Sequence, residues 1–258
     1  MSQYPPTQDK HINTVLFDLG STLIYFDGDW SQVIQEGNLE LLNFLRSAGC
    51  QLDETLFIER FRSELQAYFI ERETEFIEYT SAYILHQVLS EFGYPAVSDQ
   101  IIRQALAAMY AVTQAYWKTE PDAHSTLNIL RENGYRLGLI SNASDDADVQ
   151  SLIDQAGLRG YFEIILTSAA QGIRKPNPKI FFTALERLGS LPERSVMVGD
   201  TLGADILGAQ NSGMRGIWIT RRADTPANRA HADTIHPDAQ IANLSELPPL
   251  LTALNISR

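Results

Sequence analysis

The distribution of apolar and polar residues divides this chain of 258 residues into two kinds of segment. Residues 13–18 form a short apolar run that ends in the carboxylate of Asp18, a pattern typical of a buried strand. From about residue 121 onward, similar runs alternate with stretches of helical periodicity. Between about Trp30 and Trp117 the periodicity is helical throughout, and proline is nearly absent. We therefore expect a helical insertion within a chain of alternating strands and helices.

The alternating part predicts an α/β fold, a Rossmann-like parallel sheet with helices on both faces, because strands that alternate with helices pair in parallel. The expected strands are residues 13–18, 136–140, 163–167, 195–198 and 216–220, with a short edge strand at 233–235. The expected helices are residues 123–132, 146–156, 178–188, 204–212 and 244–254.

The insertion predicts four helices, because apolar residues recur at helical spacing within residues 39–45, 56–69, 76–92 and 101–112. Its aromatic residues are typical of a helical core rather than of a cofactor site. Residues 1–11 are polar, contain proline and are expected to form a flexible tail.

Composition excludes several classes of protein. A net charge of −12 and an isoelectric point of 4.8 argue against nucleic-acid binding and against anionic membranes. Cys50 is the sole cysteine, so a disulfide within the chain is impossible, and His231 and His236 are too loosely spaced to suggest a zinc site. The chain shows no secretory signal and no apolar run of the ~18 residues that a membrane span needs. We therefore expect a cytoplasmic protein.

Chemically capable side chains follow four of the expected strands. They are carboxylates, a hydroxyl, an amide and one lysine: Asp18, Ser141, Asn142, Lys175, Asp200 and Asp205. The carboxyl ends of parallel strands lie on one rim of a sheet, so these groups can converge there. Carboxylate oxygens are ligands that Mg²⁺ prefers, and lysine, hydroxyl and amide groups can bind phosphate oxygens.

Each of these features also has an ordinary structural explanation. An aspartate or Ser-Asn pair after a strand can cap a helix or close a turn, and a Lys-Pro loop can simply be solvated. Asp205, in the first turn of a helix, can complement the helix dipole. The order and placement of all four segments together favour a functional site.

Taken together, the four segments resemble the motifs of the haloacid dehalogenase-like hydrolase superfamily. They read FDLGST, LISN, RKPNP and VGDTLGAD, in the order that this family uses. The resemblance implies that residues 12–26 and 118–258 form a catalytic core. It also implies that residues 27–117 are the cap domain that the family inserts after its first motif.

The resemblance implies a metal site and a nucleophile. Asp18 would be the nucleophile and a Mg²⁺ ligand, and Gly20 would offer the metal its backbone carbonyl. Asp200 would be the second carboxylate ligand, and Asp205 would hold the metal's waters or Lys175.

The resemblance also implies that Ser141 and Asn142 bind a phosphoryl group whose charge Lys175 balances. Electrostatics agrees with this arrangement, because a carboxylate that attacks a phosphate dianion needs positive charge close by. An aspartyl-phosphate intermediate would form and then be hydrolysed by water.

Gly20 departs from the family pattern. Phosphatases of the family usually carry a second aspartate at this position, which protonates the leaving group and then activates water. Three alternatives remain at this point. A cap residue such as Asp27 or Asp29 substitutes for the missing acid, or the substrate has a good leaving group, or the protein binds phosphorylated ligands without turnover.

The sequence therefore predicts a Mg²⁺-dependent hydrolase of small phosphomonoesters with a phosphorylated metabolite as its partner. A 2-haloacid dehalogenase and a non-catalytic binder of phosphorylated ligands are the alternatives. No pattern in the sequence defines the particular metabolite or an oligomeric state.

Overall fold

The computed structural model describes residues 11–256, so the expected tail at residues 1–11 lies almost wholly outside the described residues. The strands are β1 Thr14–Phe17, β2 Ile24–Phe26, β3 Trp117–Thr119, β4 Arg136–Ser141, β5 Ile164–Thr167, β6 Ser195–Gly199, β7 Arg215–Ile219 and β8 Ala239–Ile241. The helices are α1 Trp30–Ser47, α2 Glu54–Glu75, α3 Ser81–Glu91, α4 Asp99–Gln114, α5 Ala123–Glu132, α6 Asp146–Gln155, α7 Ser168–Gln171, α8 Pro178–Leu188, α9 Leu207–Asn211, α10 Pro226–His231 and α11 Leu247–Ile256. A π-helical turn at Leu202–Ile206 leads into α9.

The main sheet has six strands in the order β5-β4-β1-β6-β7-β8, and every neighbouring pair is parallel. β1 therefore lies in the interior of the sheet, between β4 and β6. This confirms the α/β fold class. The position of β1 explains why all four of its residues are buried and why its sequence is a continuous apolar run.

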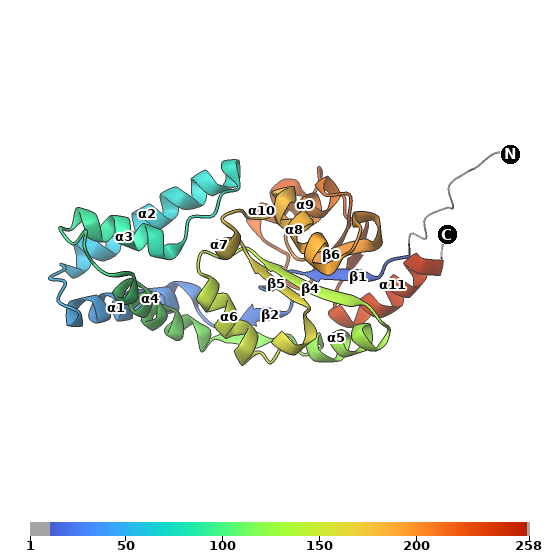
Figure 1. The fold of residues 1–258 in the computed structure, drawn as a ribbon, viewed down its shortest axis with the longest axis horizontal. Coiled ribbons are helices and arrows are strands. Elements are labelled where there is room, and N and C mark those ends of the chain that lie inside the picture. The colour runs from blue at the N-terminus through green and yellow to red at the C-terminus, as the bar shows by residue number, and fades with distance from the viewer. Residues whose placement is uncertain (1–10, 257–258) are drawn as a thin grey trace.

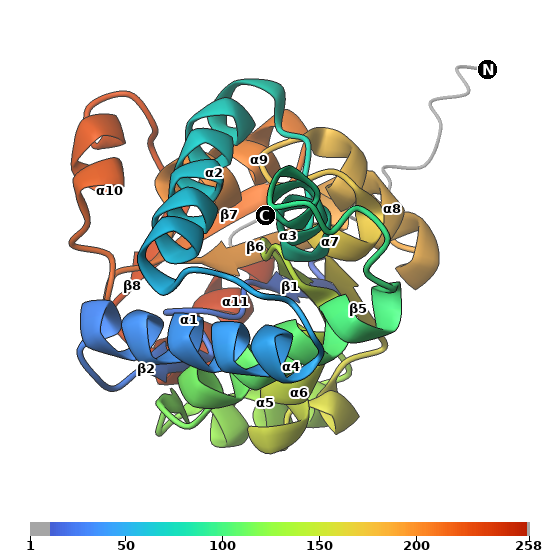
Figure 2. The ribbon, with the colours of Figure 1, turned by 90° about the vertical axis from the view of Figure 1, so that its left-hand side faces the viewer.

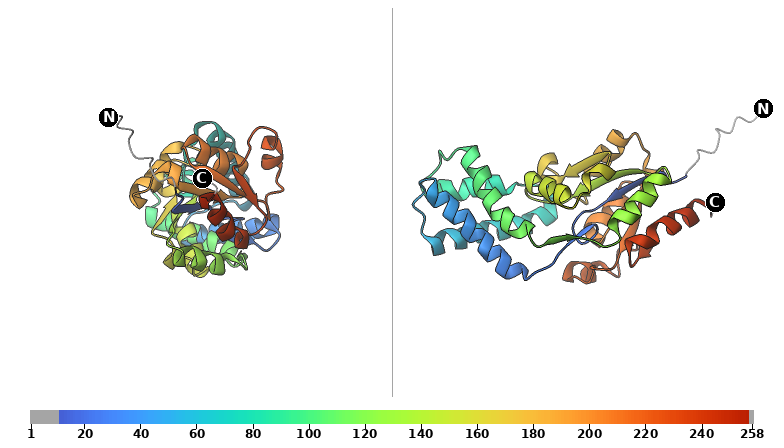
Figure 3. Two further views of the ribbon diagram at one scale, coloured as in Figure 1. Left: turned by 90° about the vertical axis from the view of Figure 1, so that its right-hand side faces the viewer. Right: turned by 90° about the horizontal axis from the view of Figure 1, so that it is seen from below.

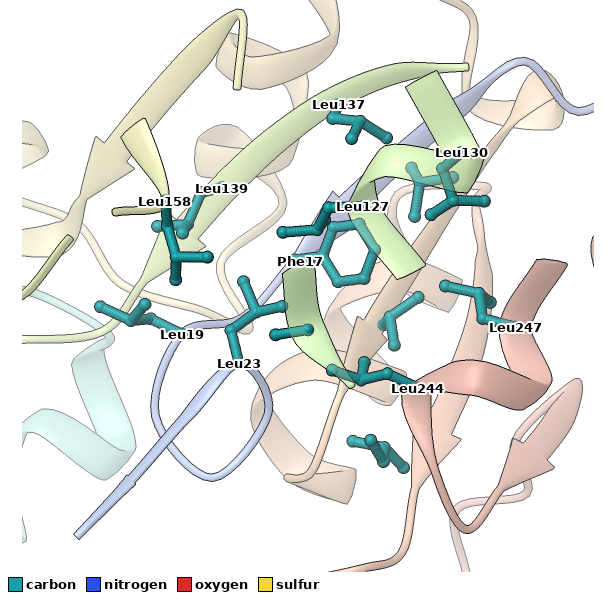
Figure 4. Close-up of a cluster of buried hydrophobic side chains, with 14 of the residues drawn as sticks. Phe17, Leu19, Leu23, Leu127, Leu130, Leu137, Leu139, Leu158, Leu244 and Leu247 are labelled. Atoms are coloured by element: carbon teal, nitrogen blue, oxygen red, sulfur yellow. The ribbon is translucent and has the colours of Figure 1, made fainter. Parts of the chain in front are cut away.

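Successive residues of β1 point to opposite faces of the sheet, and each face has its own apolar core. Phe17 packs with residues of α5, α6 and α11 on one face, as Figure 4 shows in part. Leu16 packs on the other face with residues of α8 and α9, including Phe181. The helices on both faces fix the sheet and leave its carboxyl edge to carry the polar groups.

Helices α1–α4 form a separate block at one end of the molecule, and the two ends of the described chain lie at the other (Figure 1). The block has its own core, built from apolar residues such as Leu41, Phe57 and Leu85, which are fully buried. A view from that end shows α1, α2 and α3 in front of the sheet (Figure 2), and the view from below shows the block and sheet side by side (Figure 3).

The chain enters and leaves this block through a short antiparallel pair formed by β2 and β3. Phe26 on β2 contacts the rings of Trp30, Tyr116 and Trp117, so both connections are packed against aromatic side chains. No pattern in the sequence indicated this two-stranded connection.

Two predicted elements are wrong in position. The third helix of the block was expected from residue 76, but α3 begins at Ser81, because residues 76–78 bond to the core instead: Ile77 forms a bridge with Ile173. The edge strand expected at residues 233–235 is a turn, and β8 is Ala239–Ile241. Ile235 is buried against the π-helical turn, so its apolar character reflects packing rather than strand pairing.

Within residues 11–256, none of the helices combines the length and apolar character that crossing a bilayer requires.

The neighbouring residues Phe181 and Phe182 on α8 provide a matched test of this core. Phe181 is fully buried, whereas 47% of the surface of Phe182 is exposed. We expect Phe181→Ala to lower the free energy of unfolding by about 3–5 kcal/mol, because it leaves a cavity in the core. Phe182→Ala should change it by less than about 0.5 kcal/mol. Urea unfolding followed by circular dichroism measures both, and equal losses would contradict this packing.

Candidate active site

The carboxyl ends of β1, β4 and β6 open into one cavity of about 650 Å³. Every site residue predicted from the sequence lines this cavity: Asp18, Gly20, Ser141, Asn142, Lys175, Asp200 and Asp205. The structure therefore brings together four segments that are far apart in the chain, as expected for the switch region of a parallel sheet.

Asp18 stands at the end of β1, where sheet pairing gives way to a tight loop. Its backbone N–H still donates to the carbonyl of Val198 on β6, at 2.9 Å. The chain then reverses, and the N–H groups of Leu23 and Ile24 both donate to the carbonyl of Leu19, at 2.8 and 3.1 Å. Ser21 adopts a φ of 58°, the left-handed conformation that such a turn requires.

Lys175 is a buried cation in this cavity, with 2% of its surface exposed. Its Nζ lies 2.6 Å from Asp18 Oδ1 and 2.7 Å from Asp205 Oδ1, and it donates to the carbonyl of Ile140 at 2.8 Å. Burial alone lowers the pKa of Lys175, but the carboxylates of Asp18 and Asp205 raise it above its usual value. The lysine is therefore protonated at neutral pH.

The loop that carries Lys175 is held by Asn142. The Asn142 side chain accepts from the N–H of Lys175 and donates to its carbonyl, each at 2.9 Å. The next helix begins directly after this loop, with Asn177 as its cap and Pro178 as its first residue. Ser141, the last residue of β4, is buried and faces the same cavity.

Three aspartates form an acidic cluster. Asp18, Asp200 and Asp205 each place a carboxylate oxygen within 4.8 Å of the other two. Asp205 Oδ2 accepts from the N–H of Thr201 at 3.0 Å, and the carbonyl of Asp200 accepts from Trp218 Nε1 and Asn228 Nδ2, each at 2.8 Å.

The cluster carries more negative charge than its one lysine can balance. Burial, together with the carboxylates of Asp18 and Asp205, raises the pKa of Asp200 to about 8. Burial also raises the pKa of Asp18 to about 6, although Lys175 opposes the shift. Three hard oxygen donors with an uncompensated charge fit a divalent cation such as Mg²⁺.

Contacts of α3 and α4 join the helical block to the core. The N–H of Ser81 donates to the carbonyl of Ser144 at 2.8 Å, and Gln114 Nε2 on α4 donates to Asp148 Oδ1 on α6 at 2.8 Å. A second cavity of about 450 Å³ lies between the block and the core, and it shares lining residues such as Trp117 and Asp148 with the first.

A buried ion pair ties the connection between α2 and α3 to the loop before Lys175. Glu78 Oε2 accepts from Arg174 Nη1 at 3.2 Å and from Ser168 Oγ at 2.6 Å, and Glu78 Oε1 accepts from the hydroxyl of Tyr68 at 2.5 Å. Backbone bonds join the same segments, from Glu78 N–H to Gly172 and from Arg174 N–H to Phe76. The helical block is thus fixed beside the loop that presents Lys175.

Neither of the acids considered as substitutes for the missing aspartate reaches the cavity. Asp27 and Asp29 are both exposed, neither lines the cavity, and Asp29 caps α1 by accepting from the N–H of Gln32. In this arrangement neither Asp27 nor Asp29 lies in the cavity. Asp148 does line the cavity. Its sequence position indicated only a helix, because an acid in the first turn is common in any helix.

A model of the haloacid dehalogenase-like hydrolase family matches residues 12–213. The chain is 33% identical over 242 residues to glyceraldehyde 3-phosphate phosphatase of Methanothermobacter thermautotrophicus, covering 93% of this chain and all of that protein. The chain therefore belongs to the haloacid dehalogenase-like hydrolase family. It is an enzyme of the phosphatase type within that family.

Solved structures agree with the family assignment. A 2-haloacid dehalogenase from Pseudomonas syringae is 27% identical, with a TM-score of 0.66 over 94% of this chain and 99% of that one. A phosphatase of the family from Thermococcus onnurineus is 26% identical, with a TM-score of 0.61 over 93% of this chain and 98% of that one.

Gly199 provides a test of how the acidic cluster is built. A Cβ at this position would lie 2.3 Å from Cγ of Asp205, so a side chain there must displace Asp205. We expect Gly199→Ala to lower the unfolding free energy by about 1–3 kcal/mol, as overpacking does, and to weaken Mg²⁺ binding. Isothermal titration with Mg²⁺ and urea unfolding measure the two effects.

Gly160→Ala is the control, because a Cβ there meets no atom within 4 Å. If Gly199→Ala binds Mg²⁺ as tightly as the control does, the position of Asp205 does not depend on the absence of a side chain at residue 199.

Proposed function

We propose that this enzyme hydrolyses small phosphomonoesters with the help of Mg²⁺, using Asp18 as its nucleophile. The observation that carries the proposal is the arrangement of Asp18 within a cavity, 2.6 Å from a buried lysine and next to two further carboxylates. A lone carboxylate would repel a phosphate dianion, whereas one that shares its site with cations can attack it.

Asp18, Asp200 and the backbone carbonyl of Gly20 are proposed to hold the Mg²⁺ ion. The donor set fits the ion, because all three groups supply hard oxygen atoms and line the same cavity. When bound, Mg²⁺ neutralises charge on the phosphoryl oxygens and on the carboxylates. Asp205 is proposed to hold waters of that ion and the ammonium of Lys175.

In the proposed reaction, the carboxylate of Asp18 forms a bond to phosphorus as the bond to the leaving oxygen breaks. Lys175 fixes Oδ1 of Asp18 and thereby sets the direction of the carboxylate. Ser141 and Asn142 are proposed to bind the phosphoryl oxygens at the end of β4. Water then hydrolyses the aspartyl phosphate and restores Asp18.

Residues 27–117 are proposed to act as a cap that excludes water and selects the substrate. The contacts of Ser81 and Glu78 with the core, and the cavity of about 450 Å³ beneath the block, support this role. An enclosed site favours small metabolites over phosphoproteins. The relative named above acts on glyceraldehyde 3-phosphate, which is a substrate of this size.

A 2-haloacid dehalogenase is a second candidate. One observation in its favour is that Gly20 stands where phosphatases of the family usually carry an aspartate that acts as acid and base. The other is the structural similarity to the Pseudomonas syringae enzyme. Such an activity would release halide without Mg²⁺. The acidic cluster, with its uncompensated charge, favours the metal-dependent reaction.

The Asp18→Asn variant tests the proposed nucleophile. It preserves the volume of the side chain but removes the attacking charge, so hydrolysis of 4-nitrophenyl phosphate with Mg²⁺ should fall by about 10³-fold or more. Chelation of Mg²⁺ should abolish the wild-type activity. Phosphate release measures both effects.

Asp27→Asn is the matched control, because Asp27 is an exposed acid outside the cavity and its loss should leave the rate unchanged. Turnover retained in Asp18→Asn would reject Asp18 as the nucleophile. Halide release from 2-chloropropionate without phosphatase activity would favour the second candidate, and binding of phosphate analogues without either activity would indicate a non-catalytic member.

A further inference from the structure

A phosphomonoesterase that acts on alkyl phosphates must protonate an alkoxide leaving group, and Gly20 has no side chain that could do so. The space beside Gly20 is occupied by Trp117, whose ring atoms would lie 3.6 and 3.8 Å from a Cβ at this position. The indole ring of Trp117 does not donate or accept a proton near neutral pH. The proton must therefore come from another residue that faces the cavity.

The residues that line the catalytic cavity include four carboxylic acids. Three of them, Asp18, Asp200 and Asp205, form the acidic cluster that is proposed to hold Mg²⁺ and Lys175. The fourth is Asp148, which lies outside that cluster and is partly buried, whereas His231, which also lines the cavity, is exposed to solvent. Its carboxyl group accepts from the neutral amide of Gln114 rather than from a cation.

Asp148 also lies between the two cavities. It lines both the catalytic cavity and the second cavity between the helical block and the core, so its carboxyl group faces the space that the leaving group of a bound ester would occupy. The Gln114 amide fixes Oδ1 at 2.8 Å, and Gln155 Nε2 in turn donates to Gln114 Oε1 at 3.2 Å. This chain of side chains holds the carboxyl group at the junction between the two cavities.

The protonation of Asp148 suits acid–base chemistry near neutral pH. Burial raises the pKa of Asp148 to about 6, with a smaller contribution from the Asp145 carboxylate and an opposing one from the Gln114 hydrogen bond. A group with a pKa near the working pH can both give and accept a proton.

We propose that Asp148 is the general acid and base of this enzyme. It would take the role of the aspartate that phosphatases of the family usually carry at the position of Gly20. The inference rests on the proposed phosphomonoester hydrolysis. As the bond from Asp18 to phosphorus forms and the ester bond breaks, the carboxyl proton of Asp148 passes to the leaving oxygen. The resulting carboxylate then takes a proton from the water that attacks the aspartyl phosphate, so Asp148 returns to its protonated form.

A comparison of two esters, one with a poor and one with a good leaving group, distinguishes a role of Asp148 in proton transfer from a structural role. We expect Asp148→Asn to lower kcat for glycerol 3-phosphate by about 10²–10⁴-fold, the usual contribution of general acid–base catalysis to a poor leaving group. The same variant should change phosphoryl transfer from 2,4-dinitrophenyl phosphate by no more than a few fold in a burst-phase measurement, because this phenolate leaves without a proton. Asparagine keeps the shape of the side chain and can still accept from Gln114.

Asp146→Asn is the matched control on the same turn of α6. Asp146 accepts from Thr167 Oγ1 at 2.7 Å and does not line the catalytic cavity, so its loss should not discriminate between the two substrates. Addition of Gly20→Asp to the Asp148→Asn variant should restore part of the activity on glycerol 3-phosphate, since a side chain at position 20 meets Trp117 at ordinary contact distance.

An equal loss on both substrates, or no loss on either, would overturn the role of Asp148 while leaving the proposed function intact. Wild-type protein that hydrolyses the aryl ester but not glycerol 3-phosphate would overturn it as well. Absence of Mg²⁺-dependent phosphate release from either ester by the wild-type protein would instead overturn the proposed function, and this inference with it.

Discussion

The ammonium group of Lys175 is buried between the carboxylates of Asp18 and Asp205, and the geometry of the site depends on this contact. A buried charge is costly unless it is paired and hydrogen-bonded, and Lys175 meets that condition with two carboxylates and the carbonyl of Ile140. Asn142 fixes the backbone of the same lysine through two hydrogen bonds. The contact thereby links the ends of β1 and β4 with the turn that follows β6.

The fold supplies what this contact requires. The apolar strand β1 places Asp18 at the carboxyl edge of the sheet, and cores on both faces keep that edge fixed. Gly199 leaves space for Asp205 beside the end of β6. The charged groups of the cluster are themselves buried, and electrostatic interactions are stronger there than in water.

The sequence was sufficient for the parts of the structure that depend on local pattern. Residues 178–188 were expected as a helix and α8 has these bounds, because Asn177, Pro178 and Gly189 mark its ends. All seven predicted site residues line one cavity, because parallel strands present their carboxyl ends on the same rim. The roles assigned to these residues remain predictions.

The remaining features depend on contacts between distant segments. Residues 76–80 have helical periodicity but bond to the core, as Ile77 and Glu78 do, so the third helix was predicted to begin too early. Ile235 packs against the π-helical turn. Its apolar character was interpreted as strand pairing, so an edge strand was wrongly predicted there. Asp148 could not be told from an ordinary acid in the first turn of a helix until its cavity was known.

The most direct test of the central claim is chemical trapping of the aspartyl phosphate. Wild-type protein would be mixed with Mg²⁺ and a phosphomonoester, treated with borohydride during turnover, and digested for mass spectrometry. Reduction of an acyl phosphate converts an aspartate side chain to that of homoserine, and the account predicts this product at position 18. Continued phosphate release with an unmodified Asp18 would show that the reaction does not pass through this carboxylate.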